Sequence, residues 1–200
     1  MSSILVVCSG NLCRSPMAEA ILRASLIRRF GSEPAEVSSA GTIAWEGAPA
    51  TKEAAQVAFE NNVDISGHTA RLVTQEQIAD ADLVLTMTAQ HREEVADLDP
   101  SARTRTFTLK ELVRLLEDVR TRAPDGGHDS LTSRIRAADA RRAGGPGSMP
   151  DDQDIADPIG QPIDTYRAVA WEIATWCERL IGALFGPEDA TNGPERPRPD

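Results

Sequence analysis

The sequence has little cysteine and little histidine, and neither residue type is grouped. It contains only six such residues in total: Cys8, Cys13, Cys177, His68, His91 and His128. A small, odd number of cysteines excludes a disulfide-rich secreted scaffold and is typical of the reducing cytosol. The histidines are too far apart for the usual ligand spacing of a zinc site. We therefore expect a cytoplasmic protein with no metal and no cofactor.

Positive charge and long apolar runs are also scarce. Lys and Arg total 21 against 31 Asp and Glu, a net charge of −10 over 200 residues. This balance argues against a nucleic-acid partner, although a small anion pocket is compatible with it. The apolar run Ile4–Val7 is too short for a signal segment or a membrane span. We expect one soluble domain without a membrane partner; the oligomeric state is open, with a monomer as the expectation.

Short apolar strands alternate with helical patterns over the first 118 residues. The continuous apolar run Ile4–Val7 is typical of a parallel strand that is covered on both faces. The other predicted strands are Glu36–Ser39, Leu83–Met87 and Thr104–Phe107, and the predicted helices cover about 15–30, 49–61, a short stretch after Thr74, 88–98 and 108–116. Strand and helix in this alternation predict one doubly wound α/β sheet.

This alternation stops at about Asp118. Residues 118–150 contain five glycines, three prolines and six arginines. The segment lacks enough large apolar residues for a core, although a short helix around Leu131–Arg142 fits the pattern. We interpret 118–150 as a surface insertion, which is either a solvated loop or a docking loop for a substrate or partner.

The last predicted helix carries one broad apolar stripe from Tyr166 to Leu184. Gly186-Pro187 ends it, and the polar, proline-rich residues that follow predict a disordered tail. The sequence thus divides into a domain over 1–185 and a tail over 186–200.

The most informative stretch joins the first strand to the first helix and reads Cys8-Ser9-Gly10-Asn11-Leu12-Cys13-Arg14-Ser15-Pro16. Backbone N–H groups in a tight loop, together with the positive end of a helix, hold an oxyanion. Gly10 permits the turn, Asn11 tolerates a left-handed backbone, and Arg14 offers two parallel donors to phosphate oxygens. We expect residues 9–13 to bind phosphate, with Ser15 capping the helix and Pro16 at its first position.

The same loop carries a candidate nucleophile. Positive surroundings favour the thiolate of Cys8, and Ser15 can donate a hydrogen bond to its sulfur. Attack on a phosphoester also needs an acid for the leaving oxygen, and the candidate is Asp157, which precedes Pro158. Asp-Pro alone is a weak signal, because Asp99-Pro100 is another. The alternative interpretation of Cys8 is a buried cysteine in an ordinary strand-to-helix turn.

These residues resemble the low-molecular-weight protein tyrosine phosphatase family, which has Cys-x5-Arg-Ser-Pro at its N-terminus and an Asp-Pro acid late in the chain. The resemblance covers about residues 2–117 and 152–182, and it includes Ser38-Ser39-Ala40-Gly41-Thr42, Ser66-Gly67-His68, Ala81–Met87 and Phe107–Glu111. It implies a four-stranded parallel sheet in a three-layer fold with helices on both faces. It also implies hydrolysis of protein phosphotyrosine through a phosphocysteine.

The resemblance also assigns roles to single residues. It makes Cys8 the nucleophile, Arg14 the phosphate clamp and Ser15 the stabiliser of the thiolate. Asp157 would protonate the leaving phenol and then activate water. Asn11 and Ser39 would support the loop, and Trp45 would form one wall of the pocket unless it is a core residue.

Two departures from the family pattern concern the substrate. Many members carry tyrosines directly after Asp-Pro, where this chain has Ile159 and Gly160. Protein arginine phosphatases, a branch of the same family, carry threonine where Leu12 stands. A bulky apolar Leu12 suits a phenyl ring better than a guanidinium, so we expect phosphotyrosine as the substrate and keep phosphoarginine as the alternative.

Two further alternatives use the same loop differently. A thiol-linked arsenate reductase needs resolving cysteines near residues 80–95, and this chain has none there. A phosphate-binding module without turnover would need neither a nucleophile nor an acid. Cys177 lies on the apolar stripe of the last helix, where a core residue is expected. Cys13 is either a small filler of the loop or the partner of Cys8 in a protective disulfide.

Overall fold

The computed structural model describes residues 2–32, 35–122, 130–144 and 152–186. Its strands are β1 (Ser2–Cys8), β2 (Ala35–Gly41), β3 (Leu83–Thr86) and β4 (Thr106–Thr108). Its helices are α1 (Arg14–Phe30), α2 (Lys52–Glu60), α3 (Gln75–Asp80), α4 (Ala89–Leu98), the 3-10 helix η1 (Pro100–Arg105), α5 (Leu109–Arg122), α6 (Leu131–Ala143) and α7 (Ile163–Phe185). Among the described residues, no helix has both the length and the apolar character that crossing a bilayer requires.

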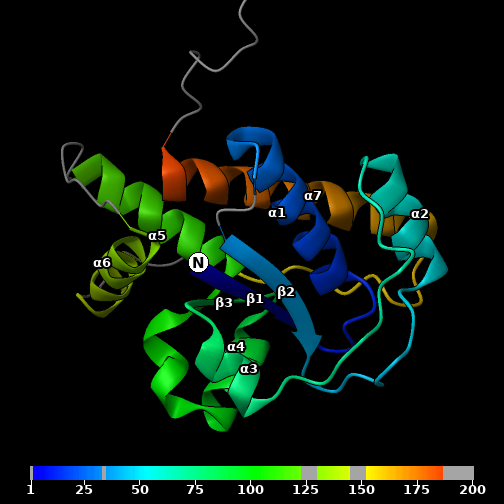
Figure 1. Ribbon diagram of the computed structural model, residues 1–200, viewed down its shortest axis with the longest axis horizontal. Helices are drawn as coiled ribbons and strands as arrows, with labels where there is room; N and C mark the ends of the chain where they lie inside the picture. Colours follow the sequence, from blue (N-terminus) through cyan, green and yellow to red (C-terminus); the bar gives the residue numbers. More distant parts are fainter. Residues whose placement is uncertain (1, 33–34, 123–129, 145–151, 187–200) are drawn as a thin grey trace, which may run out of the picture.

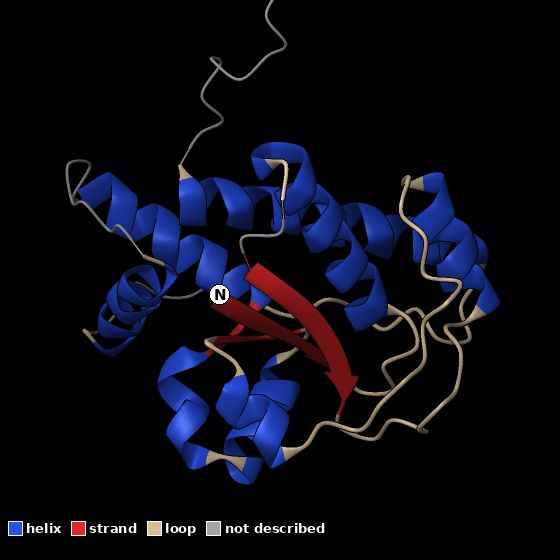
Figure 2. Cartoon of the chain, viewed as in Figure 1, coloured by secondary structure: helices blue, strands red, loops and turns tan. Residues whose placement is uncertain are grey.

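The four strands form one parallel sheet in the order β2-β1-β3-β4. Alternate residues of β1 face opposite sides: Ile4 and Val6 belong to one apolar core, and Leu5 and Val7 belong to the other. Helices α1, α2, α5 and α7 lie on one side of the sheet, and α3 and α4 lie on the other (Figures 1 and 2). The predicted three-layer, doubly wound fold is therefore confirmed.

The strand order places the end of β1 at a topological switch point. The chain leaves β1 to form β2 on one side, and it returns to form β3 on the other side. In the register of the sheet, Cys8 lies opposite Gly41 and Val7 lies opposite Thr86. Ligands of open α/β sheets bind at such a point, outside the carboxyl ends of the strands.

Helix α1 starts two residues before Pro16, the predicted first helical position. It begins at Arg14 with Cys13 in the capping position, and no side chain caps it. The carbonyl of Cys13 accepts the first helical hydrogen bond from Met17. Ser15 therefore does not cap the helix, because its hydroxyl contacts the Cys8 sulfur and the Asn11 amide instead. Pro16 is tolerated as the third residue of the helix, where a backbone N–H has no helical partner in any case.

The region after residue 116 is more ordered than the sequence analysis predicted. Helix α5 continues to Arg122 instead of ending at Leu116, and the expected short helix is present as α6. Leu131 and Ile135 of α6 are buried in the main core, although the sequence predicted too few large apolar residues for a core in this segment. Two or three apolar residues are enough to hold α6 against the rest of the domain, because α6 packs against the neighbouring helix α5. The rest of the insertion (123–129, 145–151) and the predicted tail beyond residue 186 lie outside the described residues.

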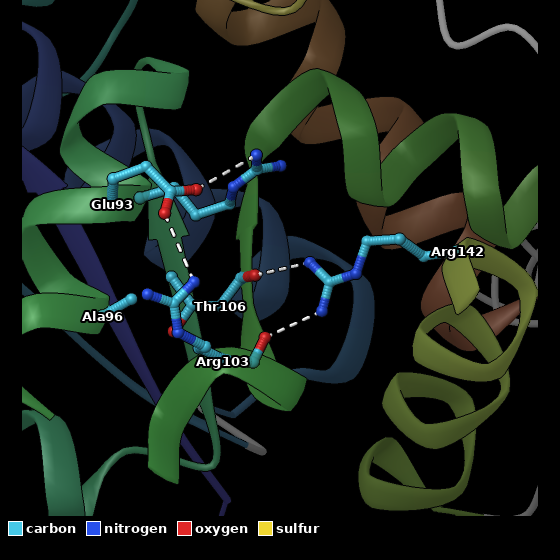
Figure 3. A pocket seen from close by; sticks show the side chains of 6 residues that line it. Glu93, Ala96, Arg103, Thr106 and Arg142 are labelled. Atoms are coloured by element: carbon cyan, nitrogen blue, oxygen red, sulfur yellow. Dashed lines mark hydrogen bonds and ion pairs between the residues drawn. The ribbon is translucent and has the colours of Figure 1, made fainter. Parts of the chain in front are cut away.

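Hydrogen bonds of Arg142 connect α6 to the β4 edge of the sheet (Figure 3). Its guanidinium donates to the carbonyl oxygens of Thr106, at 3.0 Å, and Arg103, at 2.7 Å, and it lies over the Phe107 ring. It lines a cavity of about 280 Å³ together with Arg92, Glu93, Ala96, Arg103 and Thr106. This cavity shares no lining residue with the cysteine loop.

Candidate active site

The loop after β1 brings the cysteine and the serine of the motif into contact. The Cys8 sulfur lies 3.0 Å from the Ser15 hydroxyl oxygen, and both residues are buried. The contact follows from the fold, since β1 ends at Cys8 and α1 begins six residues later. A hydroxyl at this distance can donate to the sulfur and stabilise its thiolate form.

Asn11 holds the loop from inside. Its φ of 54° is left-handed, as the sequence analysis expected of this position. Its side-chain amide donates to the hydroxyls of Ser15 and Ser39, at 2.9 Å each, and its side-chain oxygen accepts from the amide N–H of Arg71. Ser39 in turn donates to Glu19. Because Asn11 is fully buried, these hydrogen bonds are shielded from water and hold the loop in one conformation.

Arg14 lies at the centre of the site, with only 3 % of its surface exposed. Its guanidinium donates to the backbone oxygen of Ile155 at 3.0 Å, to the Ser9 hydroxyl at 3.2 Å and to Asp157 at 2.5 Å. The structure thus brings together the two charged residues that the sequence analysis selected, although they lie 143 positions apart.

Asp157 lies on a segment that is anchored at several points. Ile155 donates its N–H to the carbonyl of Met87, just beyond β3, and Asp154 accepts from the first N–H of α4. Upstream, buried Lys110 forms ion pairs with Asp152 at 2.7 Å and with Glu172 of α7 at 2.6 Å. The Asp157 side chain itself stays 41 % exposed. The backbone is therefore held in place while the carboxylate can reach a substrate.

Several residues that support the loop were not among the predicted site residues. His68 contacts the carbonyl oxygen of Asn11 through Nε2 at 2.8 Å, and His91 contacts the Ser9 hydroxyl through Nε2 at 2.8 Å. Gly41 is required by close approach, because a Cβ atom there would overlap the Ser9 carbonyl oxygen and lie 2.9 Å from the Asn11 nitrogen. Two of them stand in stretches that carry the family resemblance, Gly41 in Ser38-Ser39-Ala40-Gly41-Thr42 and His68 in Ser66-Gly67-His68, whereas the only signal for His91 was its position just beyond a predicted buried strand.

Cys13 and Cys177 are both buried, and neither forms a disulfide. The Cys13 sulfur lies 3.3 Å from the Thr51 hydroxyl, and burial raises the pKa of its thiol to about 11. Burial also raises the pKa of Cys177, which lies in the main core as predicted. The structure therefore presents Cys13 as a protonated thiol beneath the loop.

The residues proposed to touch the substrate differ in exposure. Leu12 is half-buried and packs against the main core, and its carbonyl accepts from the N–H of Thr51. Gly10 has open space on its Cβ side apart from ordinary contacts with Leu12. Trp45 is 83 % exposed, so the alternative that it is a core residue is wrong. Ile159, which follows the Asp-Pro pair, is also exposed.

Comparison with known proteins identifies the family. Residues 3–136 match the family model described as "Low molecular weight phosphotyrosine protein phosphatase". The chain belongs to this family. Within the family, it is 42 % identical over 181 residues to a protein-arginine-phosphatase of Bacillus subtilis, and the match covers 90 % of this chain and 95 % of that protein. It is 40 % identical over 184 residues to AmsI of Erwinia amylovora, a probable low molecular weight protein-tyrosine-phosphatase, with 92 % and 98 % covered.

Solved structures of the family have the same fold. The YwlE arginine phosphatase from Geobacillus stearothermophilus superposes with a TM-score of 0.67 at 33 % identity, covering 92 % of this chain and 93 % of that one. The family relatives thus include both a tyrosine and an arginine phosphatase at nearly equal identity. Overall similarity does not separate the two substrates, so the comparison between them depends on single residues of the site.

Proposed function

We propose that this protein is a cysteine-dependent phosphatase that hydrolyses protein phosphotyrosine through a phosphocysteine intermediate. The observation that carries the proposal is the convergence of three groups at the end of β1. These are the Cys8 thiol beside Ser15, the Arg14 guanidinium, and the Asp157 carboxylate paired with it. Nucleophile, anion clamp and acid are the groups that a two-step phosphoryl transfer requires.

The first step transfers the phosphoryl group to sulfur. The Cys8 thiolate attacks phosphorus, the bond from phosphorus to the phenol oxygen breaks, and protonated Asp157 gives its proton to that oxygen. Arg14 and the N–H groups of residues 9–13 stabilise the charge that gathers on the phosphoryl oxygens. In the second step, Asp157 takes a proton from water, the water oxygen bonds to phosphorus, and the phosphorus–sulfur bond breaks to release phosphate and the Cys8 thiolate.

The ion pair between Arg14 and Asp157 bears on how the site receives its substrate. The two side chains lie 2.5 Å apart. A phosphate group offers Arg14 two oxygens, so it replaces the carboxylate as a partner and frees Asp157 to face the leaving oxygen. Substrate binding and positioning of the acid are therefore one event.

Phosphoarginine is the second candidate substrate, because the relative from Bacillus subtilis is an arginine phosphatase. Leu12 favours phosphotyrosine, since the apolar side chain of this loop residue can contact a phenyl ring but cannot hydrogen bond to a guanidinium. Exposed Trp45 supplies an aromatic surface that suits a phenyl ring as a pocket wall.

We also infer a cytosolic monomer with one phosphatase domain over 1–185, in which 118–150 is inserted.

The test compares phosphate release from a phosphotyrosine peptide and from a phosphoarginine protein. The variants are Cys8→Ser and, as a matched control, Cys177→Ser, which makes the same change in the core. We expect faster release from phosphotyrosine, a loss of at least about a thousandfold in Cys8→Ser, and near-normal turnover in Cys177→Ser. Preference for phosphoarginine would transfer the function to the second candidate. No release from either substrate would disprove both.

A further inference from the structure

His91 is a buried polar residue beside the site, and the mechanism above does not use it. It is the third residue of α4 and is 4 % exposed. Thr88 caps this helix, accepting from the backbone N–H of His91 at 3.2 Å. The Thr88 hydroxyl also lies 2.8 Å from the ring Nδ1. The helix cap therefore fixes both the backbone and the ring of His91.

The other ring nitrogen points to the phosphate loop. Nε2 lies 2.8 Å from the Ser9 hydroxyl, and the same hydroxyl accepts a hydrogen bond from Arg14 at 3.2 Å. A continuous chain of hydrogen bonds thus runs from Thr88 through His91 and Ser9 to Arg14. Ser9 directly follows Cys8, so this chain joins the cap of α4 to the loop beside the nucleophile.

The geometry points to His91 as a positioning residue for the phosphate clamp: acting through Ser9, it holds the Arg14 guanidinium in the orientation that receives phosphate. This inference rests on the proposed function and adds a residue to it. Arg14 has one fixed partner on its other side, the Ile155 carbonyl oxygen. With Ser9 held by His91, the guanidinium has fixed partners on two sides, and only Asp157 has to leave when phosphate arrives.

The electrostatic surroundings of His91 fit a neutral ring that works by hydrogen bonding. Burial and the charge of Arg14 lower the pKa of His91, while Glu94, Asp157 and Asp154 act in the opposite direction. The ring therefore adds no second positive charge beside Arg14 at neutral pH. Either neutral tautomer completes the chain, because the hydroxyls of Thr88 and Ser9 can each donate or accept.

The test measures binding of inorganic phosphate and turnover of a phosphotyrosine peptide by His91→Ala, Ser9→Ala and the double variant. Loss of one hydrogen bond that orients a charged group predicts about tenfold weaker phosphate binding in His91→Ala. If His91 acts through Ser9, the double variant will bind phosphate no more weakly than Ser9→Ala alone. If the losses of phosphate affinity in the two single variants instead multiplied in the double variant, the two residues would act independently and the inference would be overturned.

Two conservative variants separate positioning from general support of the fold. Glutamine places an amide near the position of the imidazole Nε2, whereas asparagine reaches only the position of Nδ1. We expect His91→Gln to recover most of the phosphate affinity and His91→Asn to resemble His91→Ala. The inference would be overturned if His91→Gln and His91→Asn recovered the same phosphate affinity. It would also be overturned if all three His91 variants bound phosphate as tightly as the wild type.

Gln90→Ala is the matched control, because Gln90 is exposed on the same helical turn as His91. Within the described residues, its side chain hydrogen bonds only to Glu94. This variant should bind phosphate normally, and a loss equal to that of His91→Ala would overturn the inference. Failure of the proposed function would be distinguishable: wild-type protein would then release no phosphate from either substrate, whereas failure of this inference leaves wild-type turnover intact.

Discussion

Two arginines hold distant parts of this chain together, and they do so with different kinds of partner. Arg14 links the phosphate loop to the segment at Ile155 and Asp157. Arg142 links α6 to the β4 edge through the carbonyl oxygens of Thr106 and Arg103. Both guanidiniums make several hydrogen bonds, yet only one of these links can open without moving the backbone.

The difference lies in the partner and not in the arginine. Asp157 is a partly exposed side chain that can rotate away, and an incoming phosphate can replace it. The two carbonyls that hold Arg142 belong to the end of η1 and the start of β4, and the guanidinium also lies 4.2 Å from the centre of the Phe107 ring. Arg142 also pairs with Asp139, at 2.6 Å, but that carboxylate lies on α6 itself, so the link from α6 to the sheet depends on the two carbonyl oxygens. In the link made by Arg14, the Ile155 carbonyl is fixed and the Asp157 carboxylate can be displaced.

The largest effect should follow from changing the displaceable partner. Asp157→Asn removes the acid, and we expect kcat toward a phosphotyrosine peptide to fall by about 10²–10⁴-fold. The loss should shrink with p-nitrophenyl phosphate, whose leaving group needs little protonation. Steady-state kinetics on both substrates check this. Asp99→Asn changes the other Asp-Pro pair and should leave kcat near normal; equal losses in the two variants would contradict the role of Asp157.

The next effect concerns the backbone beneath the loop. Gly41→Ala places a methyl group against the Ser9 carbonyl and the Asn11 nitrogen, and neither backbone atom can give way cheaply. We expect a loss of at least about 2 kcal/mol in the free energy of unfolding, together with loss of phosphate binding. Gly67→Ala is the control, since open space surrounds that glycine. Urea denaturation and phosphate titration measure both, and equal stability of the two variants would show that the loop accommodates the methyl group.

A smaller effect should appear after oxidation. Our hypothesis is that peroxide converts Cys8 to a sulfenic acid, which Cys13 attacks to form a disulfide and water. The raised pKa of Cys13, about 11, predicts faster disulfide formation as pH rises toward that value. After treatment with peroxide and then a dithiol, Cys13→Ser should regain severalfold less phosphatase activity than the wild type. Recovery as full as that of the wild type would refute the hypothesis.

The dependence of stability on pH tests how His91 is buried. Its pKa is lowered from the ordinary 6.5, by burial first and then by Arg14. The folded state therefore binds a proton at this position less readily than the unfolded state, and stability is lost as pH falls below the ordinary value toward the lowered one. Denaturation at pH 7.5 and 5.5 should show a smaller loss for His91→Gln than for the wild type. An identical loss would mean that His91 does not contribute to the acid dependence.

The smallest effect belongs to the fixed link. Arg142→Ala should lower the free energy of unfolding by about 1 kcal/mol or less, because its guanidinium is partly exposed. Turnover should not change, since the cavity beside Arg142 shares no residue with the site. Arg142→Lys keeps the charge but loses the planar fork, so it should be destabilised nearly as much. A change in kcat would show that the two regions communicate.

The sequence was informative where one local pattern decided the structure. The apolar run of β1, the capping box at Thr74 and the stripe of α7 each predicted an element that is present. Cysteine and arginine with five residues between them, between a strand and a helix, predicted the phosphate loop in the same way. The end of α5 was missed because the residues after Leu116 are mostly polar, so the apolar period stops before the helix does.

The supporting residues of the site could not be predicted in this way. His68 and Arg71 reach the loop from the segment between α2 and α3, and His91 reaches it from α4; only the order of the strands brings these two segments to the loop. Gly41 stands in a stretch that resembles the family, but only the tertiary structure shows the close approach of the Ser9 carbonyl that requires a glycine there. Such contacts depend on tertiary structure, and the apolar periodicity that predicts helices and strands does not predict them.

The distance along the chain between Arg14 and Asp157 has a consequence for the protein during its synthesis. The nucleophile and the phosphate clamp lie close together, at Cys8 and Arg14, whereas the acid emerges 143 residues after the arginine that it pairs with. Until then, a nascent chain carries a thiol and a clamp but has no group to protonate a leaving phenol. A chain that stops before Asp157 therefore lacks the acid, and it also lacks α7, whose apolar side chains belong to the main core.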